Sequence, residues 1–69
     1  MLKCTAVIQR DGYNEERKLN VPVLPNVGDT VTYLYVHNEK FTVLSIEYVT
    51  HPDSGDCLAI NVHLEEQDS

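Results

Sequence analysis

The 69-residue sequence predicts an all-β domain in which five short antiparallel strands form a small barrel. Apolar and polar residues alternate along several segments, and no segment keeps a helical period over about ten residues. Turn-forming pairs such as Asp11-Gly12 separate these segments at short intervals. One longer connection contains Pro22 and Pro25. Short strands, tight turns and a single long connection are together typical of a small closed sheet.

The first two strands are expected to form a hairpin around Asp11-Gly12, with Arg10 opposite Tyr13. This register also turns Glu15 and Arg17 toward the inner face. We therefore expect either that the tip of the hairpin projects beyond the core or that a β-bulge shifts the register. The inward-facing apolar residues of these strands are Leu2, Cys4, Ala6, Ile8, Leu19 and Val21.

The third strand is expected to begin at Thr30 and to turn at Asn38-Glu39. With His37 opposite Lys40, Val31 faces Ile46 and Tyr33 faces Leu44 on the inner side. The opposite side of this hairpin is also apolar near its tip, which is unusual because one face of an antiparallel hairpin is normally in contact with water. The apolar residues on that second face are Leu34, Val36, Phe41 and Val43.

The fourth and fifth strands are separated by the loop from Pro52 to Asp56, which places His51 opposite Cys57. A slip of one residue would turn every inner side chain outward, so this register is strongly specified. The other face carries polar residues such as Glu47 and Asn61. The residues expected to be mostly buried are Leu44, Ile46, Tyr48, Leu58, Ile60, Val62 and Leu64.

The segment Pro25-Asn26-Val27-Gly28-Asp29-Thr30-Val31 resembles the Pro-x-x-Gly-Asp-x-Val entry of SH3-like small barrels. The resemblance covers seven residues and implies a fold, which serves many unrelated functions. The chain has no tryptophan and no aromatic-rich acidic loop, so no ligand or binding residue is transferred from peptide-binding SH3 domains. An OB-like barrel is the alternative, but the lack of a connecting helix favours the smaller one. We expect a single domain over residues 1–65 and a loose acidic tail over residues 66–69.

The formal charge of −6, from five Lys and Arg against eleven Asp and Glu, argues against direct nucleic-acid binding. No apolar run approaches the roughly 20 residues of a membrane span. The start from Met1 to Thr5 lacks the pattern of an export signal. Two cysteines far apart in such a chain predict free thiols in a reducing cytoplasm.

The doubly apolar third hairpin is the candidate interaction surface. Contiguous exposed apolar area usually marks an interface, here with a protein partner or in a homodimer. Alternatively, the loop from Val21 to Pro25 folds over this face, or the strand bends so that both faces serve one barrel. The candidate residues are Leu34, Val36, Phe41 and Val43.

The turn over residues 51–57 carries the chemistry-bearing side chains His51, Asp53, Asp56 and Cys57. A structural zinc site needs four ligands, and His63 lies too far along the strand to complete one. A Cys–His pair or an Asp pair would also need an orienting group and a water-excluding pocket, which a barrel filled by its own side chains does not offer. We therefore expect no metal, no cofactor and no enzymatic activity.

These observations favour a small non-catalytic intracellular module that binds a protein partner or itself through an apolar hairpin face. One alternative is a metal- or thiol-dependent site at the 51–57 turn. Another is an acidic inhibitor that covers the basic groove of a nucleic-acid enzyme. Short acidic chains of this kind are typical of accessory proteins of bacteria and their phages.

Overall fold

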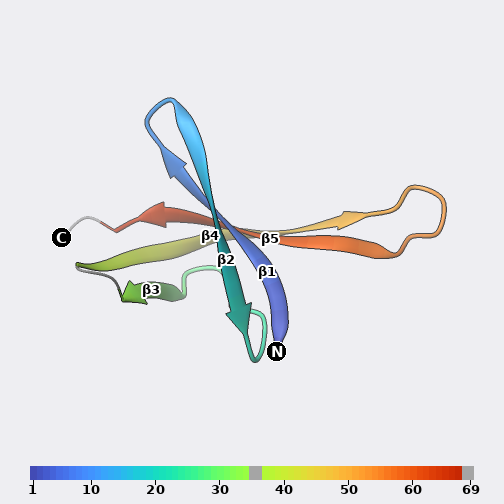
Figure 1. The fold of residues 1–69 in the computed structure, drawn as a ribbon, viewed down its shortest axis with the longest axis horizontal. Helices are drawn as coiled ribbons and strands as arrows, with labels where there is room; N and C mark the ends of the chain where they lie inside the picture. Colours follow the sequence, from blue (N-terminus) through green and yellow to red (C-terminus); the bar gives the residue numbers. More distant parts are fainter. Residues whose placement is uncertain (35–36, 68–69) are drawn as a thin grey trace.

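The protein is all-β, with five strands in a strongly curled half-barrel that is compatible with a small SH3-like barrel (Figure 1). A computed structural model describes residues 1–34 and 37–67, and it contains no helix in these ranges. The strands are β1 (Leu2–Arg10), β2 (Tyr13–Val21), β3 (Thr30–Leu34), β4 (Asn38–Thr50) and β5 (Cys57–Glu66).

The strands form one mixed sheet in the order β2-β1-β5-β4-β3. The prediction of a purely antiparallel sheet was wrong because β1 runs parallel to β5, with Thr5 opposite Asn61 and Gln9 opposite Glu65. The other three pairings are antiparallel. Parallel neighbours need a long crossover connection, and here β2, β3 and β4 together provide it. β5 is consequently the central strand, with β1 and β4 beside it, and β2 and β3 form the edges of the sheet.

The predicted register of the first hairpin is confirmed along its whole length, from Arg10 opposite Tyr13 to Leu2 opposite Val21. Gly12 adopts a φ of 81° in the turn, a left-handed conformation that glycine reaches without strain. The ladder contains no bulge, so Glu15 and Arg17 do face the inner side.

A β-bulge at Leu44 changes which side chains of β4 point into the core. Over residues 45–49 the strand pairs with β5 in the predicted register, but beyond the bulge Val43, not Leu44, lies opposite Leu64. Because side chains alternate along a strand, one extra residue exchanges the two faces. Phe41 and Val43 therefore lie in the core, with 0% and 1% of their surface exposed.

The predicted register of β3 against β4 was also wrong, because β4 already begins at Asn38, opposite Leu34, and the turn therefore does not lie at Asn38-Glu39. Val31 lies opposite Phe41, five positions from the predicted Ile46, and Tyr33 does not face Leu44. Once Phe41 faces inward, the inner side chains of β3 pair with the beginning of β4. The third hairpin therefore has one inner face, and it is the face that carries Phe41.

A single core fills the curl of the sheet. Val21 and Leu24 pack against it, so the loop that follows β2 covers the same core and not a second one. The buried members of the core are Cys4, Ala6, Ile8, Leu19, Phe41, Val43, Val62 and Leu64.

The far part of the β4–β5 hairpin projects from this core as an arm, which we define as residues 45–61 (Figure 1). Burial of Tyr48 and Leu58 was predicted wrongly, since they are 55% and 64% exposed. Leu44, Ile46 and Ile60 are half-buried. The arm also gives the chain a radius of gyration of 12.8 Å, compared with about 11 Å for a compact domain of this length.

The segment that resembles an SH3-like entry forms a turn just before β3. The Asp29 carboxylate accepts a hydrogen bond from the Asn26 backbone N–H at 2.8 Å. Gly28 has a φ of 96°, and its backbone N–H donates to the Val43 carbonyl at 2.8 Å. The turn is thus fastened to β4, and β3 begins at Thr30 as predicted.

The chain stays ordered in the sheet beyond residue 65, where a loose tail was expected to begin. Glu66 belongs to β5 and lies opposite Phe41. The Gln67 side chain donates hydrogen bonds to the hydroxyl groups of Thr30 and Thr42, at 2.9 and 3.1 Å. Residues 68–69 lie outside the described part of the chain. Within residues 1–34 and 37–67, no helix is both long and apolar enough to cross a membrane.

Candidate functional site

Of the four residues of the predicted apolar surface, the three that the structure describes do not form one surface. Phe41 and Val43 are core residues, and Leu34 is 78% exposed on the opposite face of the third hairpin. Val36 lies outside the described residues. Leu34 alone remains on the surface among the three that are described.

The 51–57 turn uses its polar groups to hold its own backbone. His51 accepts hydrogen bonds at Nδ1 from the backbone N–H groups of Asp53 and Ser54, at 3.1 and 3.4 Å. A second bulge places Cys57 opposite Thr50, so the predicted pairing of Cys57 with His51 was wrong. The described residues contain no group of three or more His, Cys, Asp or Glu side chains that could hold a metal ion.

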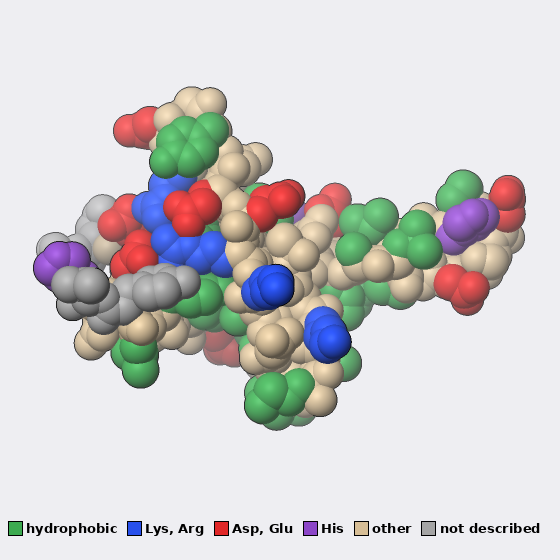
Figure 2. Space-filling view, viewed as in Figure 1, with side chains coloured by type: hydrophobic (Ala, Val, Ile, Leu, Met, Phe, Trp, Pro, Cys, Tyr) green, Lys and Arg blue, Asp and Glu red, His purple; other side chains and the backbone are tan. Residues whose placement is uncertain are grey.

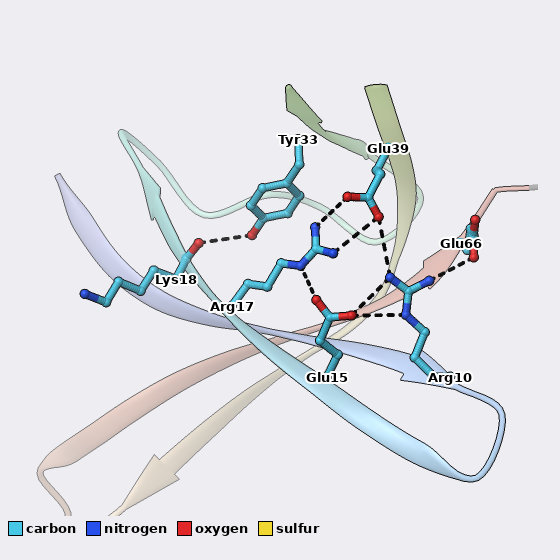
Figure 3. A network of polar contacts seen from close by, with 7 residues as sticks. All are labelled: Arg10, Glu15, Arg17, Lys18, Tyr33, Glu39 and Glu66. Carbon is cyan, nitrogen blue, oxygen red and sulfur yellow. Dashed lines mark hydrogen bonds and ion pairs between the residues drawn. The ribbon is translucent and has the colours of Figure 1, made fainter. Parts of the chain in front are cut away.

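Charged side chains from four strands, β1, β2, β4 and β5, meet at the open side of the half-barrel (Figure 3). The Arg17 guanidinium from β2 donates to both carboxylate oxygens of Glu39 in β4, at 3.2 and 3.3 Å, and also to Glu15. Arg10 donates to Glu15 at 3.2 and 3.3 Å and to Glu66 at 2.9 Å. Its guanidinium also lies 3.5 Å from Glu39. We call these five residues the arginine–glutamate network.

Contacts within the network favour the charged forms of Glu15, Arg10 and Arg17. Hydrogen bonds from Arg17 and, more weakly, from Arg10 lower the pKa of Glu15, although partial burial opposes this shift. Hydrogen bonds with Glu15 and Glu39 raise the pKa of Arg17. Burial opposes the charge of Arg10, but Glu15 and Glu66 outweigh it and the pKa of Arg10 is raised. Charge-assisted bonds of this kind are about twice as strong as neutral ones.

The network also covers the core and joins the two sides of the half-barrel. The guanidinium carbons of Arg10 and Arg17 each lie 5.7 Å from the centre of the Phe41 ring, within the range of cation–π attraction. Nearby, the Tyr33 hydroxyl in β3 donates to the Lys18 carbonyl in β2 at 3.1 Å. These contacts connect strands that share no ladder of backbone hydrogen bonds, so the network closes the half-barrel through side chains.

A shallow hollow lies beside the network at the ends of β1 and β5. Its lining consists of Gln9, Arg10, Asp11, Glu65 and Glu66. The one cation in this lining, Arg10, is already bound to Glu66. The hollow therefore presents acidic and amide groups, without the apolar walls that are typical of ligand sites.

The arm carries several exposed apolar side chains close together, whereas Leu2 on β1 and Tyr13 on β2 are exposed singly at the ends of their strands. Val62 is fully buried, its neighbours Ile46 and Ile60 are half-buried, and Tyr48 and Leu58 are mostly exposed. The apolar face of the core thus continues onto the arm through Ile46 and Ile60, which pack against the core, and through Tyr48; Leu58 is the extra residue of the second bulge. We call Ile46, Tyr48, Leu58 and Ile60 the arm strip.

The opposite face of the arm carries hydrogen-bonded polar side chains, followed toward the tip by Val49, which is 38% exposed. Glu47 accepts from the Asn61 amide at 3.0 Å and lies 3.1 Å from Nε2 of His63. These two contacts, with Asn61 the larger, lower the pKa of Glu47 and keep it ionised. Figure 2 shows green apolar side chains along the arm and red carboxylates near its tip.

Comparisons with protein-family models, curated proteins and solved structures found no match. The function must therefore be argued from the geometry of this chain.

Proposed function

We propose that the protein is a small non-catalytic interaction module that binds a partner protein through the arm strip. The observation that carries this proposal is the continuation of the core's apolar face onto a projecting hairpin, where Tyr48 and Leu58 are mostly exposed. Exposed contiguous apolar surface marks interaction sites. Tyrosine is also among the residues enriched at the energetic centres of interfaces.

The contacts of the arginine–glutamate network support a structural role for it. Both arginines direct hydrogen bonds at carboxylates of the same chain, and both lie against Phe41. This arrangement favours closure of the barrel over recognition of an external anion. A reducing, cytoplasmic location is part of the proposal, and the two free cysteines support it.

The test compares two leucines of similar exposure, Leu58 on the arm and Leu34 on β3. Tagged wild type, Leu58→Asp and Leu34→Asp would be expressed in the source cells, and captured proteins identified by mass spectrometry. We expect at least one protein that wild type and Leu34→Asp capture equally and that Leu58→Asp loses. Circular dichroism would establish that both variants are folded. Equal capture by Leu58→Asp would contradict the proposal.

A further inference from the structure

The edge of β4 along the arm is open to another strand. β3 pairs with β4 only from Asn38 to Thr42, and the loop residues Gly28 and Asp29 bind the next position, Val43. Over residues 45–50, β5 is the only described strand that pairs with β4. An unpaired strand edge presents a row of backbone donors and acceptors that an extended peptide can bind.

A third strand would also stabilise the arm. A two-stranded ribbon is at best marginally stable alone, and the part of β5 before Asn61 does not pair with β1. The arm strip gives such a ribbon a half-covered apolar face. A strand added to β4 would extend this face and cover Tyr48 from the side.

The charge of the arm indicates the chemistry of that strand. Residues 45–61 contain Glu47, Asp53 and Asp56 but no Lys or Arg. A second copy would bring one acidic arm against another, and juxtaposed like charges suppress association. A segment with Lys or Arg between its apolar residues would instead meet opposite charges.

Resting on the proposed function, we infer that the partner contributes a basic, extended segment that adds as a strand to the open edge of β4 over residues 45–50. Its alternate apolar residues pack beside Tyr48, and its basic residues lie near the carboxylates of the arm. This arrangement also favours a complex with a different protein over a homodimer of the chain.

Selection from a display library of random 12-residue peptides, with the full chain immobilised, tests this inference. We expect enriched peptides in which apolar residues alternate with Lys or Arg. Amide NMR shifts on addition of the best synthetic peptide should concentrate in residues 45–50. The double variant Asp53→Lys/Asp56→Lys should weaken its binding at least tenfold, and the matched control Asp11→Lys less than twofold.

Four outcomes would overturn the inference: no enrichment, enriched peptides without basic residues, shifts away from β4, or a wild-type dimer in sedimentation that Leu58→Asp dissociates. If the enriched peptides are neutral but lose binding in Leu58→Asp, the partner segment is not basic, although the arm is still the binding surface. The capture comparison of Leu58→Asp with Leu34→Asp decides the proposed function separately, because it does not depend on the charge of the partner.

Discussion

Truncation of Phe41 tests the bulged register of β4, because this side chain would face outward without the bulge. Phe41 is fully buried, and its ring centre lies 6.0 Å from that of Tyr33 in an edge-on arrangement. Phe41→Ala should cost about 3–5 kcal/mol of the free energy of unfolding. The total for a chain of this length is about 3–10 kcal/mol, so most of the stability would be lost. Phe41→Leu retains much of the volume and should cost about 1–2 kcal/mol.

Urea unfolding followed by circular dichroism would measure these losses, with Leu44→Ala as the matched variant. Leu44 is the extra residue of the bulge and is half-buried, so its truncation should cost less than half as much as that of Phe41. A larger loss for Leu44→Ala than for Phe41→Ala would refute the bulge and restore the register in which Leu44 faces the core.

Three further predictions concern the network and the thiols. Arg17→Met removes the cation between Glu15 and Glu39 and should lower the free energy of unfolding in urea by about 2 kcal/mol. A loss below about 0.5 kcal/mol would show that the network is not needed to close the half-barrel. The pKa of Glu15 is lowered in the folded protein, so its contribution to stability is complete above the unfolded value of 4.5 and is lost as the pH falls through the lower folded value. Thermal unfolding from about pH 5 to pH 3 should therefore depend less on pH in Glu15→Gln than in wild type, and identical profiles would contradict this. Cys57 is exposed and should react with a thiol reagent in the folded protein. Burial raises the pKa of the Cys4 thiol, which should react only on unfolding. Equal reaction rates of the two thiols in the folded protein would contradict this prediction.

Local patterns were sufficient to predict the pairing of β1 with β2 and of much of β4 with β5, but not the register of β3 against β4. Asp11-Gly12 determined the first hairpin along its whole length, and alternation determined the β4–β5 register over residues 45–49. Both results depend on contacts between residues close in sequence. The parallel pairing of β1 with β5 has no such local signal, because it depends on how the two hairpins pack against each other.

The bulge at Leu44 was the main source of error in the candidate surface. The sequence does contain a signal for it, since Val43 and Leu44 are consecutive apolar residues where the alternation changes phase, from Phe41 and Val43 to Leu44 and Ile46. The prediction assumed strict alternation of side chains across Val43 and Leu44, without a bulge, and therefore placed Phe41 on the wrong face. Two members of the arginine–glutamate network were placed correctly from the sequence, because Glu15 and Arg17 were expected to face inward. Their partner Glu39 could not be predicted once the register of β3 against β4 was wrong.

The pairing of β1 with β5 has a consequence for how the chain folds. Each hairpin can form from contacts within about 20 residues, but the core needs Ala6 beside Val62, which joins opposite ends of the described chain. Closing so long a loop is entropically costly, so we expect docking of the two preformed hairpins to limit the folding rate. In stopped-flow refolding, Val62→Ala should then slow folding, whereas Tyr48→Ala on the arm should leave the folding rate nearly unchanged. The arm would thus be free to vary for binding without altering the kinetic route to the barrel.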